Sequence, residues 1–279
     1  MAYKTLFTIM SDPTAAAAPI AQAAALANLW DAHLDVLALG IDRTQTGYYY
    51  AGANAMVLQQ TLQRAQEEAN ELEVEARKVM GEYDVRWGVD SAVVSIADMG
   101  RHVAARARFS DLAVMAQPYG DGRGIELEPA LEAALFEGNT PVLMVPANAP
   151  VKERFERIVV AWNESDEALN AVRSALPLLQ AADRVTVTII DPPTHGPERS
   201  DPGGALSQWL SRHDVHADVA VLAKTMPRVS DVIARQASDL DADLVVMGAY
   251  GHSRFREAIL GGATRGILEN AALPVFLAH

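Results

Sequence analysis

Glycines with the spacing of an anion-binding loop follow an apolar run in the last quarter of the chain. The run ends at Met247, and a helical pattern over residues 263–270 comes after the loop. Glycine lets the backbone turn tightly after a strand and approach a ligand closely. The amides and the dipole of a following helix would face an anion, and Thr264 can add a hydroxyl donor. The loop therefore favours a phosphate ligand, and its four glycines are Gly248, Gly251, Gly261 and Gly262.

The loop needs a strand before it and a helix after it, and the whole chain alternates in this way. Residues 158–160 and 244–247 are apolar at consecutive positions, which is typical of strands buried on both faces of a sheet. Strand–helix alternation predicts an α/β fold with an open parallel sheet and flanking helices. We predict strands at 5–9, 34–39, 85–89, 112–115, 142–145, 158–162, 185–190, 217–222, 244–247 and 275–277. We predict helices at 58–80, 166–176, 204–213, 230–238 and 263–270.

Three markers recur in the same order in both halves of the chain, which indicates a duplication. The residue numbers of the first pair differ by 152, and those of Met115 and Met247 differ by 132. The first half must therefore carry about 20 extra residues before Asp111. The matched segments are 5–9 with 157–161, 111–115 with 243–247, and 140–146 with 273–278.

A linker separates the two repeats. Residues 146–154 contain two prolines and no periodicity, which indicates irregular structure. We therefore predict two domains, 1–148 and 155–279, each close to the commonest domain size. Each domain is predicted to hold an open five-stranded parallel sheet with helices on both faces.

The glycine loop and its surroundings resemble those of the universal stress protein family. Nucleotide-binding members carry G-x2-G-x9-G followed by serine or threonine, and Gly248, Gly251 and Gly261 fit that spacing. The loop also lies between a D-L-V-V-M strand and an L-P-V-F-L strand, as in the family, and the duplication is similar to that of its tandem members. The resemblance implies a Rossmann-like fold of the adenine nucleotide α-hydrolase type. It also implies a stress-response sensor or regulator that binds ATP with a divalent metal such as Mg²⁺.

Carried over residue by residue, the resemblance implies an ATP site in the second domain. Ala161 and Asn163 would lie against the adenine and the ribose. Ile189 would offer backbone groups to the adenine edge, and Met247 would pack against the ligand. The sequence departs from the family pattern at two positions, because Gly262 replaces a serine or threonine and Asn163 replaces an aspartate. The phosphates would be lined by Gly248, Gly251, Gly261, Gly262, Ala263 and Thr264.

The first half lacks these features at the corresponding positions. With the two halves aligned, Glu128 and Pro129 occupy the positions of Gly261 and Gly262. Glutamate repels phosphate, and proline has no backbone N–H to donate. Residues 120–124 form a G-x-G-x-G stretch with acidic neighbours, which we interpret as a loop. The first domain is predicted not to bind ATP in the manner of the family, but to bind something else or to serve as a packing partner.

Composition and charge exclude several classes of function. The chain has no cysteine, so cysteine nucleophiles, disulfides and cysteine-ligated metal centres are absent. Its net charge of −13 disfavours nucleic-acid binding, since phosphate backbones attract basic surfaces. No apolar run reaches the roughly 20 residues that span a bilayer, and no signal-peptide pattern opens the sequence. We therefore expect a cytoplasmic protein without nucleic-acid or membrane partners.

Other candidate residues are interpreted as structural. His213 and His216 have H-x-x-H spacing without an evident third ligand, which favours a surface pair over a metal site. His252 within the glycine loop is interpreted as exposed, with phosphate contact as the alternative, and His195 as part of a loop. Tyr48–Tyr50 form a hydrophobic patch, or else a lid or partner contact.

Three functional hypotheses follow. The first is a nucleotide-binding regulator with no catalytic residues and at most slow ATP hydrolysis. The second is an interaction module whose degenerate first domain binds a partner or another small ligand. The third is an enzyme of the related adenine nucleotide α-hydrolase folds. Members of the family pair through an edge strand, so 142–145 and 275–277 are expected to pair within one chain and mimic a dimer, with a homodimer as a further association.

Overall fold

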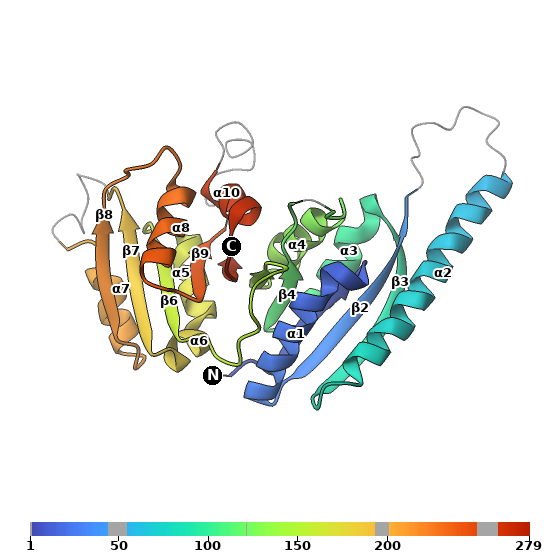
Figure 1. Ribbon diagram of the computed structural model, residues 1–279, viewed down its shortest axis with the longest axis horizontal. Coiled ribbons are helices and arrows are strands. Elements are labelled where there is room, and N and C mark those ends of the chain that lie inside the picture. Colours follow the sequence, from blue (N-terminus) through green and yellow to red (C-terminus); the bar gives the residue numbers. More distant parts are fainter. Residues whose placement is uncertain (1, 44–54, 121, 193–200, 250–261) are drawn as a thin grey trace. The chain divides into compact units, whose positions relative to one another are not determined.

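The computed structural model describes residues 2–43, 55–120, 122–192, 201–249 and 262–279 (Figure 1). Two compact bodies are formed by Tyr3–Thr140 and by Pro141–His279. Both contain strands that alternate with helices, so the predicted α/β fold is confirmed.

The first body is a parallel sheet with the strand order β3-β2-β1-β4. Helices α1 and α2 pack on β1, β2, β3 and β4, and α3 and α4 pack on each other. Right-handed crossovers place these two pairs on opposite faces of the sheet. The elements are β1 (Thr5–Met10), α1 (Pro13–Trp30), β2 (His33–Asp42), α2 (Ala55–Met80), β3 (Arg86–Ser95), α3 (Ile96–Ala107), β4 (Leu112–Ala116) and α4 (Leu127–Phe136).

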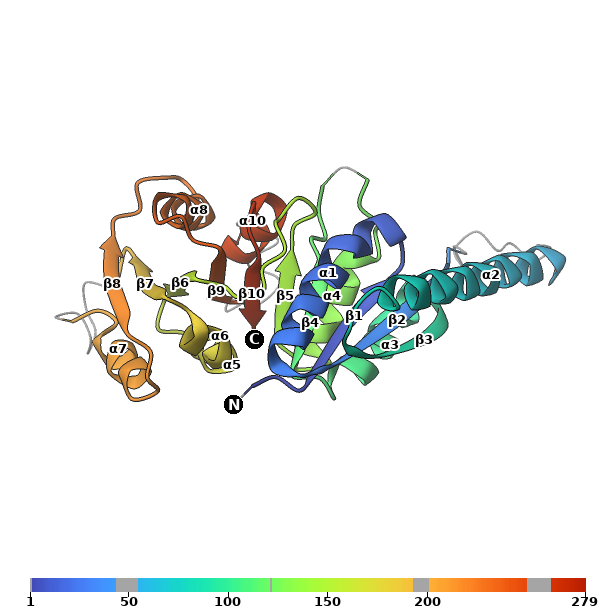
Figure 2. The same cartoon turned by 60° about the horizontal axis from the view of Figure 1, so that its bottom comes forward.

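The second body repeats this topology with the order β10-β9-β6-β7-β8, and β5 is added beside β10. Figure 2 shows α5, α6 and α7 on one side of these strands and α8 and α10 on the other. The elements are β5 (Val142–Val145), β6 (Arg157–Trp162), α5 (Asp166–Ser174), α6 (Leu176–Ala181), β7 (Arg184–Ile190), α7 (Gly204–Ser211), β8 (Ala217–Leu222), α8 (Val229–Asp239), β9 (Leu244–Gly248), α10 (Ala263–Asn270) and β10 (Val275–Ala278).

The predicted pairing of the two edge strands is confirmed. Strands β5 and β10 are antiparallel, with Leu143 opposite Phe276 and Met144 opposite Val275. All residues of both strands are buried. Because β5 pairs with β10, it groups with the second body. The domain limits 1–148 and 155–279 describe the sequence repeat and stay a prediction.

The extra residues of the first half lie largely in α2 and its flanking strands. Helix α2 has 26 residues where α7 has 8, and β2 has 10 where β7 has 7. Ala65, Ala69 and Ala76 are buried along α2. A Cβ on Gly40 of β2 would lie 2.0 Å from the Ala65 carbonyl oxygen, so glycine is needed for this close approach.

One aspartate in each half ties the start of the central strand to its neighbour. The Asp111 carboxylate accepts hydrogen bonds from the amides of Lys4 and Thr5, at 2.6 and 3.0 Å. The Asp243 carboxylate accepts hydrogen bonds in the same way from the amide of Glu156, the last residue before β6, and from the amide of Arg157, both at 3.0 Å. The aspartate that marks the sequence repeat is therefore a structural acceptor for two backbone donors.

Substitution of this acceptor is expected to destabilise the second body. Asp243→Ala leaves two backbone amides without their acceptor, so the free energy of unfolding should fall by about 1–3 kcal/mol. The control is Asp218→Ala, because the Asp218 side chain is 67% exposed and pairs with Arg184; such pairs contribute about 0–1 kcal/mol. Urea denaturation measures both variants, and equal losses would contradict the proposed role of Asp243.

Tyr3 makes the first body sensitive to alkaline pH. Its ring is buried and lies edge-on to Trp30, with the ring centroids 4.8 Å apart. Burial, assisted by the negative charge of Asp111, raises the pKa of the Tyr3 hydroxyl well above its usual value. The folded state thus favours the neutral hydroxyl. The contribution of Tyr3 to the free energy of unfolding is fully present below about pH 10, the pKa of tyrosine in the unfolded chain, and is lost as the pH rises above this value.

Tyr3→Phe should therefore reduce the loss of stability at alkaline pH. Without an ionisable group at this position, the free energy of unfolding should fall less between about pH 9 and 11 than it does in the wild type. Urea denaturation across this range tests the difference between the two proteins, which cancels the titration of the other tyrosines. A parallel pH dependence in both proteins would contradict the role of Tyr3.

Candidate functional site

Three of the predicted ligand residues lie side by side at the carboxyl ends of the second body's strands. Ala161 of β6 is in register with Met247 of β9, and Ile189 of β7 is in register with Trp162. The strand order reverses between β6 and β9, and ligands of open α/β sheets bind outside the carboxyl ends of the strands at such a point. Ala161 and Met247 point to one face of the sheet and Ile189 points to the other, so the three residues form an apolar edge at the place where a ligand is expected.

The turn after β6 is held by its own polar groups. The Asn163 side-chain oxygen accepts a hydrogen bond from the Ser165 amide at 3.2 Å. The Ser165 hydroxyl in turn accepts from the Ala168 amide at 3.1 Å and caps α5. Asn163 is exposed and uncharged, so it does not repel an anion as an aspartate would.

Gly248 has a packing role that the sequence analysis did not anticipate. A Cβ on this residue would lie 2.5 Å from the Ala168 nitrogen and 2.7 Å from the Glu167 carbonyl carbon. Gly248 therefore lets the first turn of α5 pack directly against the end of β9. Gly266 acts similarly in α10, where a Cβ would lie 2.5 Å from the Ser230 hydroxyl oxygen on α8. Both glycines bring helices close to the site.

Helix α10 begins without a side-chain cap. Gly262 is its cap residue, with φ −56° and ψ 155°, and makes no side-chain cap hydrogen bond. Ala263 is partly exposed, whereas Thr264 is buried with only 3% of its surface exposed. The remaining predicted loop residues, Gly251 and Gly261, lie outside the described residues, as does His252.

Helix α4 occupies the corresponding place in the first body and brings its own negative charges. Glu128 and Pro129 lie in its first turn, and the Tyr119 hydroxyl donates a hydrogen bond to the Glu128 carboxylate. Glu126 is buried, and a Cβ on Gly124 would lie 2.2 Å from its Oε1 atom. Carboxylates at a helix start are stabilised by the helix dipole and repel a second anion.

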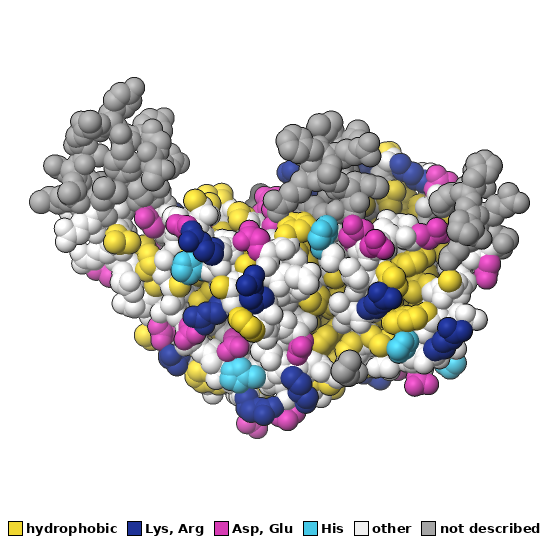
Figure 3. All heavy atoms as spheres, turned by 180° about the vertical axis from the view of Figure 1, so that it is seen from behind, with side chains coloured by type: hydrophobic (Ala, Val, Ile, Leu, Met, Phe, Trp, Pro, Cys, Tyr) yellow, Lys and Arg dark blue, Asp and Glu magenta, His cyan; other side chains and the backbone are white. Residues whose placement is uncertain are grey.

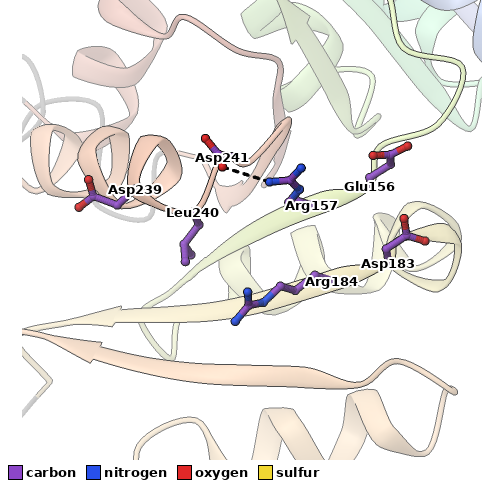
Figure 4. Close-up of a pocket in the computed structure, with 7 residues that line it drawn as sticks. All are labelled: Glu156, Arg157, Asp183, Arg184, Asp239, Leu240 and Asp241. Carbon is purple, nitrogen blue, oxygen red and sulfur yellow. Dashed lines mark hydrogen bonds and ion pairs between the residues drawn. The ribbon is translucent and has the colours of Figure 1, made fainter.

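A charged depression lies at the opposite, amino end of the second body's strands (Figure 4). Its volume is about 450 Å³. Arg157 pairs with Asp241 at 3.2 Å, and Asp183 pairs with Arg154 at 3.0 Å. Exposed pairs of this kind contribute little, and this edge is not where parallel sheets bind ligands. The lining residues are Glu156, Arg157, Asp183, Arg184, Asp239, Leu240 and Asp241.

The remaining sequence candidates do not converge on a site. His213 packs against Trp209 with the ring centroids 4.2 Å apart. His195 and Tyr48–Tyr50 lie outside the described residues. Within the described ranges, no three histidine, aspartate or glutamate side chains cluster as metal ligands do. Over the same ranges, no helix is long and apolar enough to cross a membrane.

Comparison with known proteins shows what the second half of the chain and the overall fold are similar to. The universal stress protein family model matches residues 154–279. This match covers the second half of the chain, which is therefore similar to the universal stress protein family. No curated protein sequence matches it.

Solved structures extend the universal stress protein fold over both halves. A universal stress protein from Archaeoglobus fulgidus has 14% identity and a TM-score of 0.72, covering 98% of this chain and 95% of its own. A Pseudomonas aeruginosa protein assigned to the same class has 14% identity and a TM-score of 0.60, covering 99% and 93%. A shorter universal stress protein in complex with cAMP has 20% identity and a TM-score of 0.36, covering 45% and 98%. The two full-length likenesses show a shared fold.

Two residues at the carboxyl ends of the strands were missed in the sequence. Trp162 ends β6 and Thr188 lies near the end of β7, and the Trp162 Nε1 and Thr188 Oγ1 atoms are buried without a partner in the described part of the chain. The signal was present in the alignment of the two halves, because the first half has Met10 and Leu37 at these positions.

The packing role of Gly248 leads to a stability prediction. Gly248→Ala places a methyl group against the α5 backbone, which cannot yield as a flexible side chain would, so unfolding free energy should fall by about 1–3 kcal/mol. The control is Gly100→Ala within α3, where the nearest atom is the flexible Glu137 carboxylate at 3.3 Å. That change should be neutral or stabilise by up to about 1 kcal/mol. Thermal unfolding compares the two, and a neutral Gly248→Ala would refute the close approach.

Proposed function

We propose that the chain is an ATP-binding regulator whose nucleotide site lies in the second domain. The observation that carries the proposal is the difference between the two corresponding helix starts. Neither helix start has a side-chain cap hydrogen bond, but α10 begins at Gly262, which adds no charge, whereas α4 carries Glu126 and Glu128 at its entrance. A phosphate is attracted to the first and repelled by the second.

The residues around the second crevice fit an adenine nucleotide. Ala161 and Met247 offer uncharged side chains to the base, Ile189 would offer its backbone groups to the adenine edge, and Asn163 offers a neutral amide for the ribose. The backbone at Gly262, with Ala263 and Thr264, would receive the phosphates, as would Gly248, Gly251 and Gly261 by resemblance. A divalent metal such as Mg²⁺ would be held mainly by the phosphates and water, as is usual for this ion.

Binding without efficient hydrolysis is the expected behaviour. The predicted ligand residues include no histidine or carboxylate that can act as a general base. ATP occupancy would instead change conformation or partner choice, in a cytoplasmic protein that binds neither nucleic acid nor membrane. A homodimer would use a surface other than the outer edge of β10, because that edge already pairs with β5.

The first domain supports a second candidate function, an interaction module. Its helix start is closed by Glu126 and Glu128, and Ile125 beside them is 74% exposed. The carboxylates at this entrance repel a phosphate and are compatible with a partner that is not an anion. This candidate gains support if the second domain has no nucleotide affinity.

Gly262→Pro tests the nucleotide site. The change copies Pro129 of the first domain and removes one amide donor, while the φ of −56° at this position already suits proline. A hydrogen bond to a charged group contributes about 1.5–3 kcal/mol, so ATP affinity should fall about tenfold or more. Calorimetric titration with MgATP provides the measurement.

Glu128→Gln in the first domain is the matched control and should leave ATP affinity unchanged. An equal affinity of Gly262→Pro and wild type would refute the phosphate site at α10. Absence of ATP binding by the wild type would refute the proposed function and favour the interaction module.

A further inference from the structure

Buried polar atoms without hydrogen-bond partners gather in the second body. Among the described residues three such side-chain atoms occur, Trp162 Nε1, Thr188 Oγ1 and Ser207 Oγ, and all three belong to Pro141–His279. Two of them lie on the adjacent strands β6 and β7, close to their carboxyl ends. An unsatisfied buried donor costs about 1–3 kcal/mol, so a native fold retains one where something else supplies the partner.

The first body shows what these positions hold when no partner is needed. Strands β1 and β2 pair in the same register as β6 and β7, which makes Met10 the counterpart of Trp162 and Leu37 the counterpart of Thr188. Met10 and Leu37 are 1% and 3% exposed. The duplicated frame therefore accepts aliphatic side chains here, and only the second copy carries polar atoms.

Trp162 lies at the edge where the base is expected. It is the last residue of β6 and is in register with Ile189, so both side chains point to the same face of the sheet. A Cβ on Gly203, which caps α7, would lie 2.8 Å from the Ile189 Cδ1 atom, so this is the face that α7 covers. Helix α10 lies on the other face (Figure 2).

The phosphates and the nucleoside of a bound nucleotide would lie toward opposite faces of this sheet. Phosphates at the start of α10 would lie on one face, while the Trp162 ring lies on the other beside Ile189. The indole is partly exposed although its Nε1 atom is buried. Trp162 therefore combines a partly exposed apolar ring with one buried N–H donor that lacks a partner, and it has no acceptor to offer. Thr188 faces away from Trp162, because successive residues of a strand point to opposite faces.

We infer that Trp162 recognises the nucleoside part of the ligand, with its Nε1–H donating to a ring nitrogen of the base or to a ribose oxygen. This inference rests on the proposed nucleotide-binding function and adds a specificity residue to it. The surface view in Figure 3 shows lysine and arginine scattered among aspartate and glutamate on the face seen from behind Figure 1.

Trp162→Phe tests the inference in the full-length chain. The variant keeps an aromatic ring and removes the donor, so affinity for ATP should fall about 5- to 10-fold, the effect of one hydrogen bond. Affinity for inorganic triphosphate, which has no nucleoside, should stay at the wild-type value. Calorimetric titration of both ligands measures this contrast. Without ligand, the variant should be at least as stable as the wild type, because an unsatisfied donor has been removed.

Intrinsic fluorescence gives a second, independent measurement. ATP should change the tryptophan emission of the wild type, and triphosphate should not. The ATP response should be lost in Trp162→Phe and kept in the control Trp209→Phe, because Trp209 packs against His213 on α7. If Trp162→Phe does not fold, the role of Trp162 is tested by the tryptophan emission of the wild type, which should respond to ATP and not to triphosphate.

The outcomes separate the two proposals. If Trp162→Phe binds ATP as the wild type does, or loses ATP and triphosphate affinity equally, the role of Trp162 is overturned while the nucleotide site stands. If the wild type binds no ATP, the nucleotide site itself is overturned.

Discussion

The amide groups at the start of a helix need an acceptor, and this need organises both halves of the chain. Asp12, Ser95 and Ser165 supply it through their side chains at α1, α3 and α5. Helix α4 carries acidic residues in its first turn, while α10 starts at a glycine with no side chain to offer. Neither start has a side-chain cap hydrogen bond. Since helix starts are positively polarised, the carboxylates of α4 balance this polarity, whereas Gly262 adds no charge that would do so.

Duplication left the frame constant and changed the ends of the strands. Asp111 and Asp243 bind corresponding backbone amides at the amino ends, so the central strands start in the same way in both copies. At the carboxyl ends Met10 is replaced by Trp162, and the helix entrance changes from acidic to neutral. Divergence at this edge is tolerated because the loops beyond the strands carry few of the contacts that hold the sheet together.

Much of the fold was predictable because buried parallel strands are apolar at consecutive positions. The strands at 142–145 and 217–222 and the helix at 263–270 have the predicted bounds. Strand β3 extends to Ser95, beyond the predicted end at residue 89. It is a partly exposed edge strand, and its alternating polar residues lack the continuous apolar run on which the prediction relied. The packing role of Gly248 was not predictable, since it depends on the approach of α5, which lies about 80 residues earlier in the chain and is set only by the tertiary fold.

Prediction of the candidate site from the sequence is limited even more strongly by its dependence on the tertiary fold. A glycine spacing can be read along the chain, and it predicts a phosphate site without any knowledge of the fold. An unsatisfied Trp162 Nε1 atom can be recognised only when all its neighbours are in place, because it is defined by the partners it lacks. The comparison of the two copies removes part of this difficulty. Each copy is a control for the other, and a polar residue that replaces Met10 or Leu37 within one constant frame marks a position where packing alone did not decide the residue.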